Sequence, residues 1–219
     1  MVSAKTIFWE VDAQRDFLYP GGALYVPGAE AILQNLDRLV EAARRGWVFL
    51  VSSADAHHPG DPELTEWPPH CLAGTPGAEI VAEGQAGRRL VIPNRAEFVL
   101  PVDLASYQQV TLEKNTLDVF ENPQTERLVA RLTPSGSPQF EADVEFVVFG
   151  VVTEYCVRCA VEGLLRGGRR VAVVTDAVWP LDPGRGRELL DGWQARGVRP
   201  IATATAVALV APPKAALRA

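Results

Sequence analysis

"DVEFVVFGVVTEYCVRCAVEGLLRGGRRVAVVTDA", residues 143–177, is the stretch that decides the fold of this chain. An apolar run over 143–151 predicts a strand, the apolar residues of 153–168 have helical spacing, and 169–177 predicts a second strand. Strand, helix and strand in this order imply a right-handed crossover between parallel strands. Nearly continuous apolar runs are typical of strands that are covered on both faces. The stretch therefore indicates a parallel sheet with helices on both sides.

The same alternation continues along the rest of the chain. Strands are expected at 6–11, 47–53 and 109–114, helices at 28–46, at 124–132 and from about Gly184, and a last strand and short helix within 198–210. We therefore expect a single-domain three-layer α/β/α sandwich around a mainly parallel, doubly wound sheet. The domain is expected to span 1–219, with its core at about 6–210. In such folds, ligands bind outside the carboxyl ends of the strands.

The bulk composition limits the class of protein. Its net charge of −6 argues against a nucleic-acid partner, because phosphate backbones call for a surplus of lysine and arginine. No apolar stretch is long enough to span a bilayer, and "MVSAKTIFWEVD" (1–12) lacks the zones of a secretory signal. Three cysteines, an odd number, fit a reducing compartment better than a disulfide framework. We expect a cytoplasmic protein with no membrane partner.

Two cysteines, Cys156 and Cys159, follow the first strand of the quoted stretch. Thr153 can cap the predicted helix, and Cys156 then lies in its first turn, where free backbone N–H groups favour a thiolate and can hold an oxyanion. Cys159 turns toward the polar side of that helix. We favour Cys156 as a nucleophile, with two buried structural thiols or a C-x-x-C redox pair as alternatives. A zinc site would have only His70 and Cys71 to complete it, at poor spacing.

A nucleophilic cysteine needs a base and an electrostatic partner. Asp12 comes directly after the first expected strand and Lys114 ends the strand at 109–114, so both are expected at the same edge of the sheet as Cys156. Taken singly, an aspartate after a strand often caps a turn and a lysine there is often solvated. Asp16 is expected to be structural, with backbone or arginine partners.

The three histidines fall within one polar loop. In extended backbone, Asp55 and His57 point to the same side, and His70 can arrive from the following loop. Two imidazoles and a carboxylate suit Zn²⁺, Mn²⁺ or Fe²⁺. Asp61 or Glu63 could add an oxygen ligand, and we favour Glu63. His58 points to the other side. A polar surface loop without a metal is the alternative.

Several motifs in a fixed order carry a family resemblance. They are "VDAQRDF" (11–17), "PGGALYVPGA" (20–29), "DAHHPGD" (55–61), "WPPHCLAGTPGAEI" (67–80), "EK" at 113–114 and "GVVTEYCVRCAVEGLL" (150–165). Each motif is weak alone, but the ordered combination is specific. From about residue 6 to 210, the chain resembles the isochorismatase-like cysteine hydrolases, most closely the nicotinamidase branch.

The resemblance implies a catalytic triad of Asp12, Lys114 and Cys156. It also implies a cis peptide bond between Val151 and Val152. The backbone N–H groups of Val152 and Cys156 would then form the oxyanion hole. On this basis Cys156 is the reactive thiol and Cys159 is a bystander.

The resemblance implies a metal site and a ring-binding pocket as well. The implied ligands of a divalent ion are Asp55, His57 and His70, and the implied pocket walls are Phe17, Trp67 and Tyr155. The chain departs from the family pattern at three residues. Glu10 replaces an apolar residue, Arg15 stands where asparagine is common, and Glu154 stands where aspartate is usual. Glu10 would need a partner, such as an arginine or a neighbouring subunit.

The expected activity is hydrolysis of nicotinamide to nicotinate and ammonia through a thioester on Cys156. An amidohydrolase acting on an N-carbamoyl, ureido or other small amide is the first alternative, and a C-x-x-C redox protein is the second. Isochorismatase proper usually lacks the metal residues, which counts against it. The expected partners are a small-molecule amide substrate and further copies of the chain, as a dimer or tetramer.

Overall fold

The computed structural model describes residues 5–133 and 144–213. The two ends of the expected domain, and residue 143 of the expected strand 143–151, lie outside the described residues. One sheet of seven strands has the order β3-β4-β2-β1-β5-β6-β7, and its neighbouring pairs are parallel. The strands are β1 (Lys5–Val11), β2 (Phe49–Asp55), β3 (Arg89–Ile92), β4 (Gln109–Lys114), β5 (Val144–Val151), β6 (Arg170–Trp179) and β7 (Arg199–Ile201).

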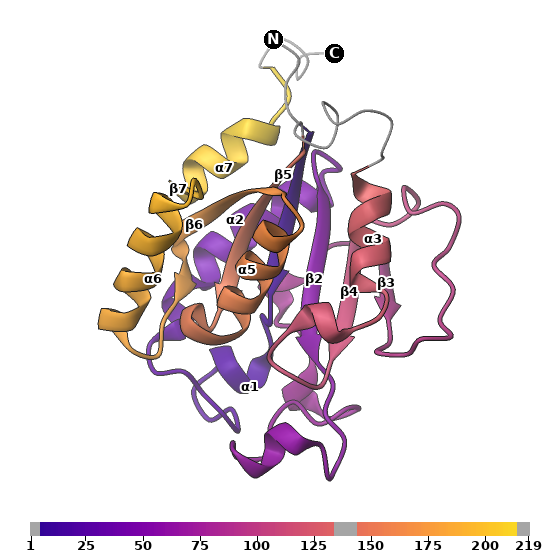
Figure 1. Ribbon diagram of the computed structural model, residues 1–219, viewed down its shortest axis with the longest axis vertical. Helices are drawn as coiled ribbons and strands as arrows, with labels where there is room; N and C mark the ends of the chain where they lie inside the picture. Colours follow the sequence, from indigo (N-terminus) through magenta and orange to yellow (C-terminus); the bar gives the residue numbers. More distant parts are fainter. Residues whose placement is uncertain (1–4, 134–143, 214–219) are drawn as a thin grey trace.

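Helices cover both faces of this sheet (Figure 1). On one face lie α2 (Leu33–Arg44) and α7 (Thr203–Val210), and on the other lie α3 (Thr125–Leu132), α5 (Arg158–Arg166) and α6 (Pro183–Ala195). Along β1, Phe8 belongs to the core beneath α2, whereas Ile7 and Trp9 belong to the core beneath α5. The expected three-layer α/β/α sandwich is confirmed.

The short helix α1 (Arg15–Leu18) and the loop after β2 lie at the end of the sheet to which the strand arrows point (Figure 1). Within residues 5–133 and 144–213, the helices are too short or too polar for any of them to cross a membrane.

The element boundaries differ from expectation in several places. The helix expected at 28–46 begins with a 3₁₀ turn, Ala29–Ile32, before α2, and Gly46 ends it in the left-handed region with a φ of 71°. β2 lies two residues later than expected, so Asp55 is its last residue. β3 was not expected, because only one of its four residues is buried and so short an edge strand has no clear apolar pattern.

The helix expected at 153–168 begins with a π-helical turn, Thr153–Val157, which α5 continues. The wider turn arises because the Val157 N–H donates to the Val152 carbonyl at 3.1 Å, five residues back. The expected cap by Thr153 is wrong. Val152 precedes the turn, and the buried Thr153 hydroxyl has no hydrogen-bond partner.

The junction between β5 and this turn requires a glycine. Gly150 has a φ of 119°, and a Cβ at that residue would lie 2.0 Å from the Val11 carbonyl oxygen of β1. The pairing of β5 with β6 shifts its register between Val148 and Gly150. The peptide bond between Val151 and Val152 is cis, as the family resemblance implied.

Glu10, in the central strand β1, is fully buried. Its Oε2 accepts hydrogen bonds from Ser52 Oγ at 2.8 Å and from Gln109 Nε2 at 3.2 Å. Its partners are therefore neutral groups of the same chain, rather than the expected arginine or neighbouring subunit. Burial raises the pKa of Glu10 to about 8, against the lowering effect of Ser52.

Candidate active site

Four neighbouring strands end in chemically active side chains. Lys114 is the last residue of β4, Asp55 is the last residue of β2, and Asp12 directly follows β1. Cys156 lies in the turn that follows β5. In the parallel pairing of β2 with β4, Asp55 stands directly opposite Lys114. The topology thus brings together residues from four distant segments at the carboxyl edge of the sheet.

Lys114 lies at the centre of this cluster. Its Nζ is 2.9 Å from Asp12 Oδ2 and 3.5 Å from Cys156 Sγ, and it also contacts Asp55 Oδ1. Ser53 Oγ donates to Asp12 Oδ1 at 2.9 Å. These side chains are all buried. The sulfur, the acid and the amine therefore lie within contact distance, while their catalytic roles stay predictions.

The charges of the cluster set its protonation states. Burial acts to lower the pKa of Lys114, but Asp12, Asp55 and Cys156 outweigh it and hold that pKa well above its ordinary value. Burial and the charge of Asp12 raise the pKa of the Cys156 thiol, against the opposing effect of Lys114. Burial outweighs the lowering of a thiol pKa that a helix N-terminus can give, so the net pKa of Cys156 lies above its ordinary value. Cys156 at rest is a thiol that needs a base.

Cys159 differs from Cys156 in its setting. It is only partly buried, and its pKa is raised by burial. Cys71, Cys156 and Cys159 are all free thiols. Cys71 has a φ of 43°, and its backbone N–H donates to Asp16 Oδ2 at 2.7 Å. Asp16 Oδ1 also accepts from the Ala23 N–H at 2.9 Å, so Asp16 is structural, as expected.

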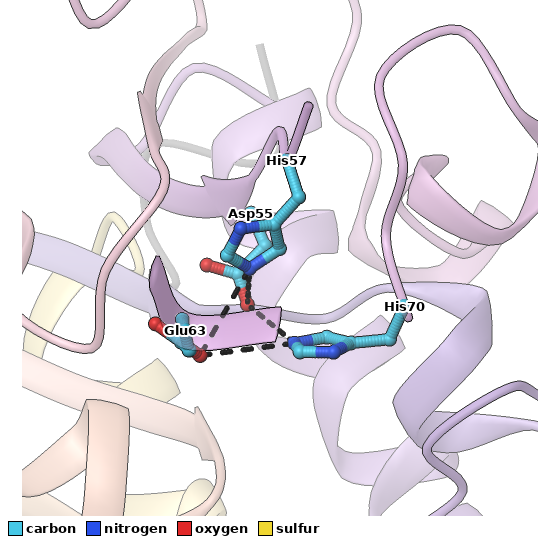
Figure 2. Close-up of side chains that lie close together, drawn as sticks. All are labelled: Asp55, His57, Glu63 and His70. Carbon is cyan, nitrogen blue, oxygen red and sulfur yellow. Dashed lines mark ion pairs between the residues drawn. The ribbon is translucent and has the colours of Figure 1, made fainter. Parts of the chain in front are cut away.

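Beside this cluster, four side chains converge as a candidate metal site (Figure 2). Asp55 Oδ2 and Glu63 Oε1 each lie 3.8 Å from His70 Nε2 and 3.9 Å from His57 Nε2. Asp55 Oδ2 and His57 Nε2 are buried and have no hydrogen-bond partner. Buried polar atoms without partners are costly, and a cation among them would satisfy them. The residues therefore fit a divalent metal, and Glu63 offers a fourth ligand atom. The roles of the four residues as ligands stay predictions.

Neighbouring groups position two of these residues, Asp55 and His70. Gln14 holds the backbone of Asp55, since its Oε1 accepts from the Asp55 N–H at 2.7 Å and its Nε2 donates to the Asp55 carbonyl at 2.8 Å. The Nδ1 of His70 lies 2.8 Å from the Pro68 carbonyl oxygen. Burial lowers the pKa of both His57 and His70, which favours the neutral rings that bind metals. Sequence reasoning missed Gln14, because its role depends on contacts distant in the chain.

A pocket opens above Cys156 and the metal site. The three residues expected as its walls do line it, and the rings of Trp67 and Tyr155 meet edge to face with 5.3 Å between centroids. Phe17 packs against the His70 ring at 5.4 Å. Further lining residues were not expected from the sequence: Leu24, Tyr25, Val26, Leu117 and Leu181. They come from loops after β1, β4 and β6, and no local pattern marks them.

Known proteins are similar to this chain over most of its length. A family model described as the isochorismatase domain matches residues 7–94. The nicotinamidase/pyrazinamidase of Mycobacterium tuberculosis is 30% identical over 175 residues, which cover 76% of this chain and 82% of that protein. The chain belongs to the isochorismatase-like cysteine hydrolase family, in its nicotinamidase-like branch.

Solved structures of the family agree with this. The pyrazinamidase of Pyrococcus horikoshii, determined in complex with zinc, has 25% identity and a TM-score of 0.69, covering 90% of this chain and 99% of that one. The N-carbamoylsarcosine amidase of Thermoplasma acidophilum has 22% identity and a TM-score of 0.69, covering 91% and 96%, and supports the fold alone.

Membership in this family confirms the expectation of a hydrolase, and the branch is one of hydrolases of amide C–N bonds. The zinc in the Pyrococcus relative and the four converging ligand atoms agree with a divalent metal in this chain. The oxyanion hole at Val152 and Cys156 stays a prediction. The homo-oligomer, the cytoplasmic location and the absence of a nucleic-acid partner also stay predictions.

Proposed function

We propose that this protein hydrolyses nicotinamide, or a closely related amide on a nitrogen heterocycle, to the carboxylate and ammonia. The observation that carries the proposal is the contact of Cys156 Sγ with the Lys114 ammonium, itself 2.9 Å from Asp12, beneath a pocket with aromatic walls. The nicotinamidase and pyrazinamidase relatives support the same substrate class.

In the proposed mechanism, Asp12 takes the thiol proton as Cys156 Sγ attacks the amide carbon. The base is needed because the raised pKa of Cys156 keeps the thiol protonated at rest. Lys114 balances the negative charge of the cluster. The N–H groups of Val152 and Cys156 receive the oxyanion, Asp12 passes the proton to the leaving nitrogen, and ammonia departs. Water then cleaves the thioester and restores the thiol.

Asp55, His57, Glu63 and His70 would hold the divalent ion. When bound, such an ion supplies a Lewis-acid contact for a ring nitrogen of the substrate. Zn²⁺ is the proposed metal, because two imidazoles and two carboxylates suit it and a relative was solved with zinc. Mn²⁺ and Fe²⁺ accept the same ligand types.

The lining of the pocket favours an uncharged ring over a substrate that carries a carboxylate. Its three acidic residues, Asp12, Asp55 and Glu63, are balanced by Lys114 and by the proposed divalent ion. The described lining includes no arginine or lysine that could pair with the carboxylate of an N-carbamoyl amino acid, and the rest of it is mainly aromatic and aliphatic. This supports nicotinamide over the N-carbamoyl alternative.

The test is ammonia release from nicotinamide, pyrazinamide, N-carbamoyl and ureido compounds, with added Zn²⁺ or Mn²⁺. The wild type is expected to prefer the two ring amides, and Cys156→Ala is expected to lose at least about 10³-fold in kcat. The matched control, Cys159→Ala, should keep its rate. A Cys156→Ala variant near the wild-type rate, or hydrolysis confined to carbamoyl compounds, would refute the proposal. A Cys156–Cys159 disulfide under mild oxidation would favour the redox alternative.

A further inference from the structure

The carboxylate of Glu154 connects the nucleophile turn to the segment between β6 and α6. Glu154 lies two residues before Cys156 and its side chain is buried. Its Oε2 accepts from the Leu181 N–H at 3.1 Å, and its Oε1 accepts from the Asp182 N–H at 2.5 Å. One carboxylate thus receives two consecutive backbone N–H groups, each on its own oxygen.

The same segment is held at two other points. The Trp179 Nε1 donates to the Pro27 carbonyl at 3.0 Å, which ties the segment to the loop before α2. Asp182 Oδ1 caps α6 by accepting from the Gly184 N–H at 2.7 Å. The backbone from 179 to 182 is therefore fixed on three sides. The side chain of Leu181 projects from this fixed backbone. It is 47% exposed and lines the same pocket as Cys156.

We propose that Glu154 is a positioning residue that holds Leu181 in place as a wall of the substrate pocket, and that Leu181 selects a flat, uncharged ring. This rests on the proposed function and adds a specificity determinant to it. An exposed leucine at a pocket mouth gains from contact with an apolar ring, because that contact removes its side chain from water. The contact is favourable only if the leucine is already held in position.

The chemistry of the glutamate accounts for the arrangement. A glutamine has one acceptor oxygen, so its NH₂ group would face one of the two backbone N–H donors and leave that donor without a partner. An aspartate is one methylene shorter, and its carboxylate would lie farther from both N–H groups. Either change would loosen the backbone of Leu181 while leaving the triad side chains in place.

The first test is a double-mutant cycle on nicotinamide hydrolysis with Glu154→Gln, Leu181→Ala and the double variant. Each single change is expected to raise KM about fivefold and to change kcat less than about twofold. If Glu154 acts through Leu181, Glu154→Gln should add less than about twofold to KM in the Leu181→Ala background. If the increases in KM from the two single changes multiply in the double variant, the proposal is wrong.

The second test needs no substrate. Hydrogen exchange of the amides of 179–186 is expected to rise about tenfold in Glu154→Gln, because their acceptor is weakened. Glu162→Gln is the matched control: Glu162 also ties α5 to α6, accepting from Trp193 Nε1 at 2.9 Å, but it does not line the pocket. It should change neither KM nor this exchange. Unchanged exchange in Glu154→Gln would overturn the positioning role.

The two tests separate the inference from the function on which it rests. If the wild type hydrolyses no ring amide, the proposed function fails and the ring selection by Leu181 fails with it. Hydrogen exchange in Glu154→Gln still tests whether Glu154 positions the segment 179–182. If Glu154→Gln does not fold, Glu154→Asp replaces it, with the same expected direction and a smaller rise in KM.

Discussion

Two buried carboxylates, Glu10 in β1 and Asp12 directly after it, lie in different surroundings. Asp12, at the end of the strand, lies 2.9 Å from the ammonium of Lys114. Glu10, in mid-sheet, receives hydrogen bonds only from the neutral Ser52 and Gln109, and burial raises its pKa to about 8. Burial therefore favours the neutral form of Glu10, which acts as a packed polar group. The comparison teaches that a cation at the sheet edge, rather than the carboxylate alone, separates a carboxylate of the candidate active site, such as Asp12, from a packed polar group, such as Glu10.

The hydrogen bonds to Glu10 and to Asp12 come from two different serines of the neighbouring strand β2. Ser52 and Ser53 are consecutive residues of β2, and consecutive side chains of a strand point to opposite faces. Ser52 Oγ donates to Glu10, whereas Ser53 Oγ donates to Asp12. Changes to one carboxylate can therefore be made with little effect on the hydrogen bonds of the other.

The largest expected effect comes from removing the cation. Lys114→Met keeps the length of the side chain but leaves Asp12 and Asp55 buried without their counter-charge. We expect kcat for amide hydrolysis to fall by about 10²–10³-fold or more, and the free energy of unfolding to fall by about 3–5 kcal/mol. Ammonia release and chemical denaturation measure the two effects.

The control for this change is an exposed ion pair. Arg166, which lies 3.2 Å from Asp118 at the surface, should tolerate Arg166→Met with little change in rate or stability. If Arg166→Met and Lys114→Met lower kcat and the free energy of unfolding equally, the cation at the sheet edge has no special role and the prediction is wrong.

The next largest effect is expected at the candidate metal site, which lies at the same edge of the sheet. His57→Ala removes one of four converging ligands and should lower zinc affinity by about 100-fold or more, since changes that only reorient a ligand cost 10–100-fold. His58→Ala is the control, because His58 is exposed and outside the ligand set. Metal content and competition with a chelator measure the difference. Equal zinc affinity of the two variants would contradict the assignment.

The smallest expected effect on activity concerns Glu10, which lies outside the candidate active site. Its folded-state pKa of about 8 lies above the ordinary 4.5, so its contribution to stability is full below pH 4.5 and is lost as the pH rises toward 8. Glu10→Gln does not titrate, and its stability relative to the wild type should rise by up to about 1.4 kcal/mol per pH unit across this window. Denaturation at pH 5, 6.5 and 8 measures it, with the exposed Glu126→Gln as control. A difference that is constant with pH would contradict the burial argument.

Much of the fold and site could be predicted from local pattern. The strand at 109–114 has the expected bounds, and Asp12, Asp55, Lys114 and Cys156 come together because parallel strands end at one edge. Spacing alone suggested Asp55 and His57 as ligands on one side of the chain. These features depend on residues near one another in sequence and on a topology rule.

The features that were missed depend on contacts between distant segments. The partners of Glu10 come from β2 and β4, and the pocket wall at Leu181 depends on Glu154, 27 residues away. The raised pKa of Cys156 follows from burial, which a helix pattern does not reveal. The Thr153 cap failed because a π-helical turn replaced the expected α-helical start.

The register of β2 on β4 has a consequence for how this chain can vary in length. Asp55 and Lys114 meet because they are paired residues, and a slip of one residue would turn every side chain of β2 to the opposite face. An insertion beside Val99, which is 83% exposed in the segment between β3 and β4, would leave this pairing unchanged. Deleting a single residue within β2 would instead aim Asp55 away from the lysine and disconnect both halves of the site.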